Sequence, residues 1–508
     1  MATHNLNFGS GGSSASCRLP SGDLDPCTIV IFGATGDLTS RKLLPALFNL
    51  YRNRNLPEPC VIVGCGRTDL DSASFRKYLR EKCPDAATDS GEWVSFMKRV
   101  HYQQVLYDSL GTYQELAVYL EALDKSEGTT GNRIYDLAVP PALYPVIAKN
   151  LTRAGLATEE NGRWTRIVVE KPFGSDLASA RELDRVIHEG FTEEQIFRID
   201  HYLAKETVQN IMMLRFANSI FEPLWNRNYI EYVGIAAAEE LGVGTRAGYY
   251  EKTGVVRDMF QNHLLQLLSL IAMEPPAAFS PDRIRDEKVK VFRSLQPFTS
   301  VDLDEDLILG QYGPDRTGKV PGYRQEAGIS SDSLTPTFAM MRLFLDNWRW
   351  QGVPFYLYSG KRLARKDTRM VIQFKHAPHS MFREVLGENI TANRLTMAIF
   401  PEEEIRLSFQ TKVPGARICL QTMNLDFNYS EDFSGPVLAA YEKVLLDCMQ
   451  GDQMFFWRQD AVELAWEFLT PILEECAVCD DRPGRLHFYE AGSWGPEAAG
   501  EWLSQLMK

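Results

Sequence analysis

The sequence predicts an α/β region followed by a larger α+β region. Over roughly the first two hundred residues, short apolar runs at 29–32, 61–63, 134–139 and 167–169 alternate with helical stretches, which is typical of βαβ units with a parallel sheet. Beyond about residue 200, apolar and polar residues alternate at 395–399 and 405–409, as in an antiparallel sheet with one solvated face. The chain has 508 residues, 44% hydrophobic and 24% charged, which is enough for two or three domains.

The first elements follow a polar N-terminal segment. Residues 1 to about 22 are rich in Gly, Ser and Asn and carry few apolar side chains, so we expect a disordered tail that ends by residue 27. The first strand, 29–32, leads through a glycine turn into a helical stretch with Leu43, Leu44, Leu47 and Leu50. A second strand at 61–63 completes a βαβ unit.

The turn after the first strand carries two glycines. It consists of Gly33, Ala34, Thr35, Gly36, Asp37 and Leu38. Its place between a strand and a helix suits a pyrophosphate that rests on the helix N-terminus, as in a Rossmann-like dinucleotide-binding domain. We expect the segment from Asp37 to Ser40 to cap that helix. The spacing is GxxGxL rather than GxGxxG, and without its context such a turn is more often an ordinary tight turn.

Arg67 follows the second strand, where NAD-binding enzymes place an acid on the ribose 2′-hydroxyl. An arginine at this point favours a 2′-phosphate, so the expected cofactor is NADP. The alternative is a solvated cation at a strand end, and an arginine taken alone does not distinguish the two.

The segment Glu170-Lys171-Pro172-Phe173-Gly174 follows the strand at 167–169. It therefore lies at the carboxyl edge of the sheet, where open α/β sheets bind their ligands. From this edge Lys171 can reach both a cofactor and a substrate. Pro172 is a candidate for a cis peptide bond.

Two cationic donors follow in the segment from residue 198 to residue 206. If that segment is helical, His201 and Lys205 are four residues apart and point from one face. Two cationic donors at this spacing can hold a phosphate, because its charge strengthens their hydrogen bonds. On spacing alone, a surface pair without function is the more common interpretation.

His263 lies in an apolar helical stretch from residue 255 to residue 268. A histidine there is more often a hydrogen-bonded core residue than a catalytic base. Asp258, five residues earlier, lies about 140° around a helix of 3.6 residues per turn and is poorly placed to orient His263. We therefore expect any orienting carboxylate to come from another segment.

The remaining elements complete the second region. Residues 338–345 and 370–374 are predicted to be further strands of the antiparallel sheet. The C-terminal portion returns to helix, with an apolar stripe at Ala461, Leu464, Ala465, Phe468 and Leu469. The sequence shows no internal repeat and no long linker, so we expect the two halves to pack tightly.

Composition argues against several kinds of partner and site. The net charge of −13 disfavours nucleic acid and anionic membranes as partners. No apolar run approaches the ~20 residues needed to cross a bilayer, and the first 27 residues lack the order of a secretory signal, so we expect a cytoplasmic protein.

Cysteines and histidines give no metal motif. The nine cysteines are odd in number and irregularly spaced, which favours reduced thiols over a disulfide framework. Cys476 and Cys479 have no second ligand pair, and a proline separates His376 from His379 without a matching carboxylate. We expect no metal site.

Eight blocks of this sequence, in order and spacing, resemble the glucose-6-phosphate dehydrogenase family. They are GATGDLTSRKLLPAL, RIVVEKPFG, FRIDHYLAKETVQN, RDMFQNHLLQLL, RDEKVKV, LILGQY, WQGVPF and GKRLARK. The resemblance runs from about residue 28 to about residue 495, and the block with HYLAKE is highly specific. It implies a Rossmann-like NADP-binding domain over 28–199 and a substrate-binding and oligomerisation domain over 200–508, with an extended, mainly antiparallel sheet and flanking helices. Members usually form homodimers or homotetramers.

The resemblance also implies an activity. It is the oxidation of D-glucose 6-phosphate at C1 to 6-phosphoglucono-1,5-lactone, with reduction of NADP, at the start of the oxidative pentose phosphate pathway. His263 would be the general base and Asp200 would orient it. His201, Tyr202 and Lys205 would hold the 6-phosphate. Lys171, Glu239 and Asp258 would contact the sugar, and Lys361 and Lys366 would complete the substrate site. The cofactor would be bound by Gly33 to Leu38, Arg67, Tyr144 and Lys171.

Three departures from the family pattern stand out. Ala204 replaces the usual glycine of HYLGKE, and alanine is the better helix former. Phe400 stands where many members carry a substrate-contacting glutamine, which puts that sugar contact in doubt. The chain ends at Lys508 without the aromatic extension with which some members bind a second, structural NADP, so we do not expect that second site.

Two other functions fit parts of the pattern. A non-catalytic sensor of NADP or sugar phosphate on the same scaffold would lose the base, whereas Asp200 and His263 are both present. A dehydrogenase of an unphosphorylated substrate would not need the HYLAKE block.

Overall fold

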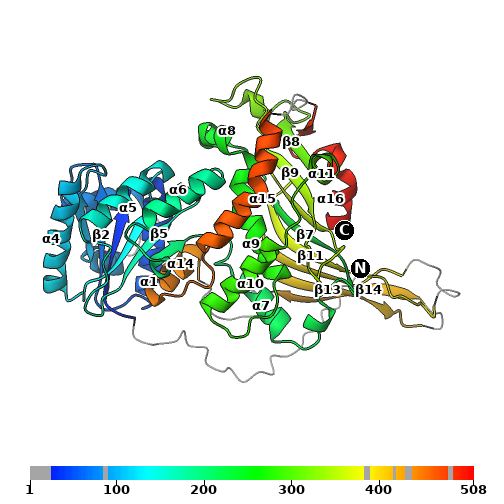
Figure 1. The fold of residues 1–508 in the computed structure, drawn as a ribbon, viewed down its shortest axis with the longest axis horizontal. Coiled ribbons are helices and arrows are strands. Elements are labelled where there is room, and N and C mark those ends of the chain that lie inside the picture. The colour runs from blue at the N-terminus through cyan, green and yellow to red at the C-terminus, as the bar shows by residue number, and fades with distance from the viewer. Residues whose placement is uncertain are drawn as a thin grey trace.

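A six-stranded parallel sheet forms the first region of the computed structural model, which describes residues 24–83, 90–382, 390–415, 419–428, 438–478 and 484–507 (Figure 1). Its strands are β1 (Cys27–Phe32), β2 (Cys60–Gly66), β3 (Val100–Gln104), β4 (Asn132–Leu137), β5 (Thr165–Val169) and β6 (Ile196–Arg198). The order β3-β2-β1-β4-β5-β6 is that of a doubly wound dinucleotide-binding fold, in which ligands generally bind at the carboxyl ends of the strands where the order reverses, here β1 and β4. The Rossmann-like prediction is confirmed.

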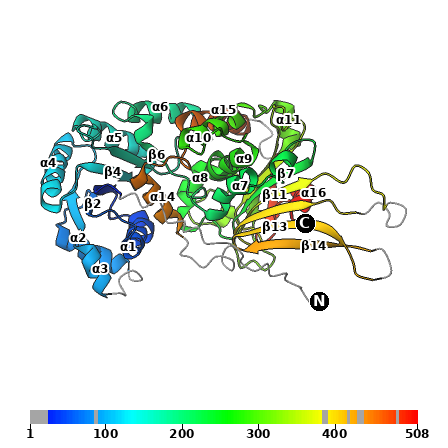
Figure 2. The same cartoon turned by 90° about the horizontal axis from the view of Figure 1, so that it is seen from below.

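Helices cover both faces of this sheet. One face carries α1 (Leu44–Arg52), α2 (Ser72–Lys82) and α3 (Ser90–Met97), and the other carries α4 (Leu110–Glu127), α5 (Tyr144–Arg153) and α6 (Leu177–Ile187). A helix from far along the chain, α14 (Ala440–Gln450), joins the first face, because Val444, Leu445 and Cys448 lie in the apolar cluster formed by β1 and α1 (Figure 2).

A nine-stranded sheet forms the second region. Its strands are β7 (Ile230–Ala238), β8 (Leu307–Gly313), β9 (Phe338–Leu343), β10 (Phe355–Gly360), β11 (Asp367–Phe374), β12 (Arg394–Phe400), β13 (Glu404–Lys412), β14 (Leu420–Asn428) and β15 (Leu486–Glu490). Their order is β14-β13-β12-β11-β7-β10-β9-β8-β15. All neighbours are antiparallel except β7 with β10 and β8 with β15. The predicted mainly antiparallel sheet is confirmed.

Helices of the second region lie between the two sheets or beside the second one (Figure 1). They are α7 (Glu206–Phe216), α8 (Ala247–Val255), α9 (Leu265–Ala272), α10 (Pro281–Arg293), α11 (Ser300–Asp306), α15 (Gln459–Val478) and α16 (Gly500–Met507). A π-helical segment, Val256–Leu264, joins α8 to α9. The predicted stripe of α15 is confirmed, because Ala461, Ala465 and Leu469 are buried.

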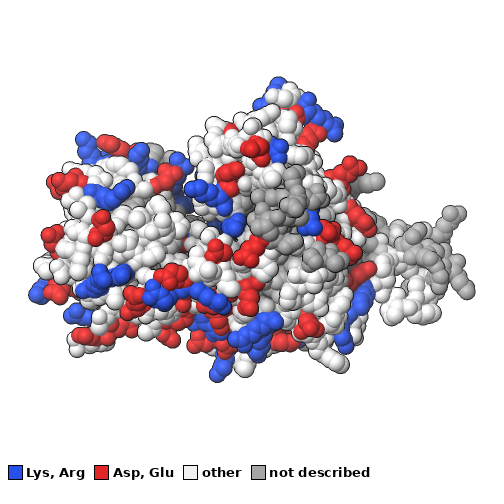
Figure 3. Space-filling view, turned by 45° about the horizontal axis from the view of Figure 1, so that its top comes forward, with Lys and Arg blue, Asp and Glu red and all other residues white. Residues whose placement is uncertain are grey.

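The two regions share one apolar core. A single cluster runs from Val30 in β1 through Ile271 in α9 to Met370 in β11, which confirms the predicted tight packing. In Figure 3 acidic and basic side chains are interspersed over both regions, so the face shown has no extended surface of one sign. None of the described helices is both long and apolar enough to span a membrane. Residues 1–23 of the predicted tail, and Cys479 of the cysteine pair, lie outside the described residues.

Candidate active site

The glycine turn follows β1 directly and closes against the neighbouring strand ends. Gly33 has φ +83°, and a Cβ there would lie 2.1 Å from the carbonyl oxygen of Ala138. The Gly33 N–H donates to the carbonyl of Cys65 at 2.9 Å, so the turn is fixed to the end of β2. Only glycine fits this position, because a side chain there would collide with the backbone that follows β4.

The predicted cap of the following helix is wrong. The helix has Leu38 at its N-cap and no capping side chain. The Ser40 hydroxyl instead donates to the carbonyls of Gly36 and Asp37 at 3.1 and 3.3 Å, and the exposed Asp37 carboxylate pairs with Arg41. The serine lies inside the first turn, where its hydroxyl bonds backward along the helix rather than to the free N–H groups.

The other two predicted cofactor residues lie in different surroundings. Arg67 comes directly after β2 and is exposed, so its guanidinium is accessible to an anion. Tyr144 is the first residue of α5 and is only 1% exposed, so it belongs to the wall beneath the crevice. Burial raises the pKa of Tyr144 well above its ordinary value, and the nearby Glu170 acts in the same direction.

Lys171 follows the end of β5 and reaches into the second region. Its ammonium nitrogen lies 2.9 Å from Nε2 of His263, and it donates to the backbone carbonyl and to Oδ1 of Asp258 at 3.0 and 3.3 Å. The Lys171–Pro172 peptide bond is cis, as expected. One lysine thus links the edge of the parallel sheet to the π-helical segment.

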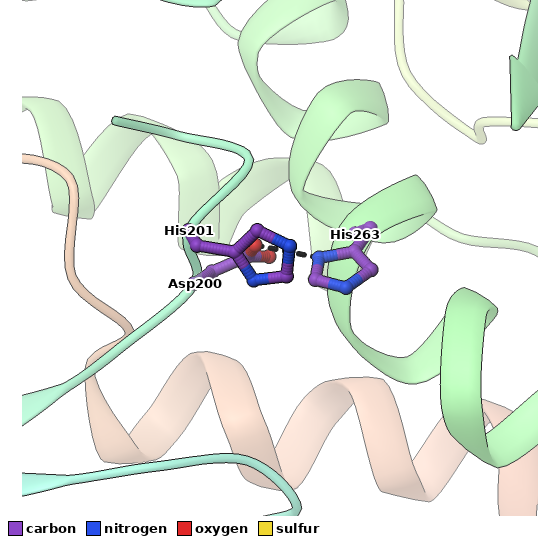
Figure 4. A group of neighbouring side chains, drawn as sticks. All are labelled: Asp200, His201 and His263. Atoms are coloured by element: carbon purple, nitrogen blue, oxygen red, sulfur yellow. Dashed lines mark hydrogen bonds and ion pairs between the residues drawn. The ribbon is translucent and has the colours of Figure 1, made fainter. Parts of the chain in front are cut away.

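His263 and Asp200 form a buried pair (Figure 4). The distance from His263 Nδ1 to Asp200 Oδ1 is 2.6 Å, and the same oxygen accepts the backbone N–H of Tyr202 at 3.0 Å. Burial would raise the pKa of Asp200, but the imidazoles of His263 and His201 and this N–H outweigh it and hold the pKa at about 2. Asp200 is therefore a carboxylate, and the expectation that the orienting acid comes from another segment is confirmed.

The surroundings of His263 favour its neutral imidazole form. Burial lowers its pKa below the ordinary value, and Lys171 adds to this, while Asp200 opposes it. The ring of Tyr202 stacks on His263 with 4.0 Å between ring centroids, and the ring of His201 lies edge-on at 4.9 Å. Neutral imidazole is the form that can accept a proton.

Residues 201–204 form turns rather than the predicted helix, and α7 begins only at Glu206. The Leu203 N–H donates to the carbonyl of Asp200, while the Asp200 carboxylate accepts from Tyr202, which is a turn that an aspartate favours. His201 and Lys205 are therefore not on one helical face. The helix-forming tendency of Ala204 does not bear on this site either, because that residue lies in the turn.

The lowered pKa of His201 favours its neutral form over the predicted cation. Burial is the main cause of the fall in its pKa to about 3, and His263 and Lys171 also lower it. Burial likewise lowers the pKa of Lys205, with nearby Lys366 acting in the same direction. The ammonium groups of Lys205 and Lys366 lie 5.7 and 4.0 Å from the ring centroid of Phe400. Phe400 thus takes part in this cluster through its aromatic face.

Ion pairs connect the remaining predicted sugar residues to Lys171. Lys361 Nζ lies 2.6 Å from Glu239 Oε2 and 3.8 Å from Asp258 Oδ2. Lys171 contacts both Asp258 and His263, although an angle of about 140° around an α-helix would place these two residues on different faces. The segment is a π-helix, whose longer turn brings residues five apart closer to one face.

Two buried acids near the site were missed in the sequence. Among the described residues, neither carboxylate oxygen of Asp136 in β4 has a hydrogen-bond partner, and burial raises its pKa well above the ordinary value. Burial also raises the pKa of Glu170 to about 7, although the Tyr441 hydroxyl donates to it at 3.0 Å. An aspartate in the middle of an apolar strand was the available signal for the first of them.

The contacts of Asp200, His201 and His263 argue against a metal ion at these three residues. Ligand atoms of Asp200, His201 and His263 lie within 4.8 Å of one another (Figure 4). However, His263 and Asp200 already bond each other, and the ammonium of Lys171 would repel a cation at Nε2. The absence of a metal site stays a prediction.

Two family models together account for most of the chain. One, described as the NAD binding domain of glucose-6-phosphate dehydrogenase, matches residues 30–210, and the other, described as its C-terminal domain, matches residues 212–507. The chain belongs to the glucose-6-phosphate dehydrogenase family. The two matches meet at residues 210–212, inside α7 and shortly after the loop that carries Asp200 to Lys205.

Individual relatives agree with this membership. The glucose-6-phosphate 1-dehydrogenase of Aggregatibacter actinomycetemcomitans is 46% identical over 482 residues, which cover 94% of this chain and 96% of the relative. That of Treponema pallidum (strain Nichols) is 44% identical over 492 residues, covering 95% and 94%. A solved structure of glucose-6-phosphate dehydrogenase in complex with its substrate glucose-6-phosphate gives a TM-score of 0.87 at 34% identity, covering 95% and 97%. The enzyme of Mycobacterium avium gives 0.79 at 33% identity, covering 94% and 98%.

Proposed function

We propose that the chain oxidises D-glucose 6-phosphate at C1 to 6-phosphoglucono-1,5-lactone and reduces NADP, the first step of the oxidative pentose phosphate pathway. The observation that carries the proposal is the buried His263–Asp200 pair, with Nε2 of His263 within reach of Lys171. Family membership supports the same substrate and reaction.

His263 acts as the general base. Its Nδ1–H donates to the carboxylate of Asp200, so a neutral imidazole presents its lone pair at Nε2. Nε2 takes the proton of the C1 hydroxyl as the C1 hydride leaves, and Asp200 stabilises the imidazolium that forms. Because the hydrogen bond to Asp200 fixes the tautomer of His263 before the substrate binds, the ring does not have to reorient during the reaction.

Lysines around Phe400 hold the phosphate. Lys205 and Lys366 provide two ammonium groups near one aromatic face, and His201 and Tyr202 lie between them and the base. Lys171, Glu239, Asp258 and Lys361 bind the sugar hydroxyls. Phosphate binding far from C1 supplies the energy that keeps C1 in register with the base.

The glycine turn and Arg67 hold NADP. The glycine turn leads from β1 directly into the N-terminus of the next helix, which suits a pyrophosphate, and the exposed Arg67 suits a 2′-phosphate. Lys171 completes the cofactor side, and Tyr144 supports it from below. When bound, the nicotinamide accepts the hydride; the protein positions it and excludes water.

The outer strands of the second sheet suggest a homodimer or homotetramer. Apolar residues pair across β13 and β14, Leu407 with Leu425 and Phe409 with Met423, and Leu425 is 44% exposed. An apolar sheet face of this kind is typical of a subunit contact. Analytical ultracentrifugation of Leu425→Arg against the wild type tests this. We also propose a cytoplasmic location, which the free thiols of Cys27, Cys60, Cys65, Cys83, Cys419 and Cys448 support.

Absorbance at the reduced-nicotinamide band tests the activity. The purified chain is assayed with glucose 6-phosphate and with glucose, each with NADP and with NAD. The proposal predicts rapid reduction with glucose 6-phosphate and NADP, and much slower reduction without the phosphate. Binding of NADP or of glucose 6-phosphate without any turnover would favour the sensor function instead.

A further inference from the structure

The Asp200 carboxylate has one oxygen that the proposed mechanism does not use. Oδ1 accepts from His263 and from the Tyr202 N–H. Oδ2 is buried, and among the residues that the structure describes it has no hydrogen-bond partner. A buried carboxylate oxygen without a donor is costly, so its surroundings should contain a compensating group.

Lys288 in α10 is such a group. The residue is 2% exposed, and its ammonium nitrogen has no hydrogen-bond partner in the described part of the chain. Burial lowers the pKa of Lys288 to about 7, and the charge that opposes this fall is that of Asp200. A buried ammonium without a partner is as unfavourable as the unpaired carboxylate oxygen.

A tryptophan places α10 against both halves of the catalytic pair. Phe292, one turn after Lys288, stacks on Trp457 with 5.6 Å between ring centroids. Trp457 Nε1 donates to Oδ1 of Asn262, the residue before His263, at 2.8 Å. The backbone N–H of Trp457 donates to the carbonyl of Arg198 at 3.1 Å, two residues before Asp200. The face of α10 that carries Lys288 is thereby fixed beside both segments.

Asn262 contributes a further unused donor. Its Oδ1 is occupied by Trp457, whereas its Nδ2 is buried and without a partner among the described residues. The packed segments that carry Asp200, Asn262 and Lys288 thus offer an ammonium and an amide that can donate, and one carboxylate oxygen that can accept. A buried water is held by two to four polar partners of this kind.

We propose that Lys288 is a positioning residue that acts on His263 through Asp200. Its ammonium and Nδ2 of Asn262 hold Oδ2 of Asp200 through a buried water, and this fixes the carboxylate that orients the imidazole. The inference rests on the proposed function, because it assumes that His263 is the base.

Charges around Lys288 come from several segments. Arg285 lies on the same helix and Arg458 just before α15, and both lower the pKa of Lys288. Arg458 is itself paired with Asp460 and Asp286, and Arg285 with Asp282. Asp200 lies on the loop after β6, and His263 on the π-helical segment. Of the groups that act on Lys288, Asp200 is the anion.

Lys288→Met tests the proposal, because methionine keeps much of the chain volume and removes the charge. We expect kcat to fall about tenfold, with little change in KM for glucose 6-phosphate or NADP. The acid limb of the pH profile of kcat/KM should move to higher pH, since losing a buried cation makes the imidazolium of His263 easier to form. Lys290→Met is the matched control, because Lys290 lies on the same helix, is exposed and pairs with Glu287.

A double-mutant cycle separates positioning from packing. In the Asp200→Asn background, Lys288→Met should change kcat by less than about twofold, because the carboxylate through which it acts is gone. An equal loss in both backgrounds, or a variant with wild-type kcat and acid limb but a lower melting temperature, would overturn the proposal. If Lys288→Met does not fold, Lys288→Gln, which retains a donor but no charge, carries the same cycle. Turnover by the wild type tests the proposed function independently of these ratios.

Discussion

The ammonium nitrogen of Lys171 lies 2.9 Å from Nε2 of His263, the atom that would accept the substrate proton under the proposed mechanism. Because Nδ1 of the ring bonds Asp200, a neutral His263 has only Nε2 as an acceptor. The Lys171 ammonium therefore favours an unprotonated His263. Under the proposed mechanism the sugar hydroxyl would displace this contact, and Asp258 could retain the ammonium, since it already accepts from it.

The pH profile should reflect this arrangement. The pKa of His263 is lowered first by burial and then by Lys171, so activity should persist below the ordinary histidine pKa of about 6.5 before it falls. Lys171→Met removes the cation, and the acid limb of kcat/KM should move to higher pH. Measuring kcat/KM between about pH 5 and pH 8 checks this. An unchanged limb in the variant would mean that Lys171 does not control His263.

Replacing the base should separate catalysis from binding. His263→Asn should reduce kcat by about 10² to 10⁴, while the affinities for glucose 6-phosphate and NADP persist. Asp200→Asn should give a smaller loss, and the double variant should lose much less than the product of the two. These constants are measured on protein with an intact thermal transition. Near-native turnover by folded His263→Asn would return the residue to a packing role.

The phosphate contact is tested at Lys205. Lys205→Ala removes one charge-assisted donor and should cost about 1.5 to 3 kcal/mol of substrate binding, with NADP affinity nearly intact. Glucose serves as the internal control, because it lacks the phosphate. A loss of the same factor on glucose 6-phosphate and on glucose would exclude the phosphate role.

Phe400 should affect the same step more weakly. Its ring faces the ammonium groups of both Lys205 and Lys366, so Phe400→Leu removes two cation–π contacts while preserving bulk. We expect KM for glucose 6-phosphate to rise about three- to tenfold and KM for NADP to stay unchanged. Phe400→Tyr keeps the aromatic face and should behave like the wild type. A loss in Phe400→Tyr equal to that in Phe400→Leu would rule out the aromatic contact.

Cofactor choice is tested at Arg67. A guanidinium matches the 2′-phosphate and an acid repels it, so Arg67→Asp should raise KM for NADP far more than KM for NAD. Arg41→Asp is a matched control, since Arg41 is also exposed near the glycine turn but pairs with Asp37. Equal losses with both cofactors in Arg67→Asp would overturn the assignment.

Much of the fold could be predicted because its signals are local. The alternation of apolar runs and helices gave the parallel sheet, and the two-residue period gave the outer strands β12 and β13. His201 and Lys205 do not share a helical face, because the Asp200 carboxylate and the backbone form turns between them. Spacing alone does not reveal such turns. The predicted angle between Asp258 and His263 was wrong, because it assumed 3.6 residues per turn and the segment is π-helical. The conclusion that the orienting carboxylate comes from another segment was confirmed.

Other features depend on contacts between distant segments. The charge state of His201 is set by burial beneath neighbours that no periodicity predicts. The stacking of lysines on Phe400 joins the turn before α7 to the end of β12 and the loop before β11. The burial of Lys288 likewise depends on how α10 packs, with Phe292 stacked on Trp457, which the sequence of that helix does not reveal.

Helix α14 is synthesised long after the sheet that it covers, and this delay affects how the first region folds. It leaves the ribosome about 400 residues after β1, yet Val444, Leu445 and Cys448 cover the same face of the first sheet as α1, and Glu442 accepts a hydrogen bond from Asn49 in α1 at 2.8 Å. At about 5 to 20 residues per second, the part of this face that α14 covers stays exposed for roughly 20 to 80 s in a nascent chain. The nucleotide-binding region therefore completes its core after translation of the sheet that follows it, and chaperones have that interval in which to bind.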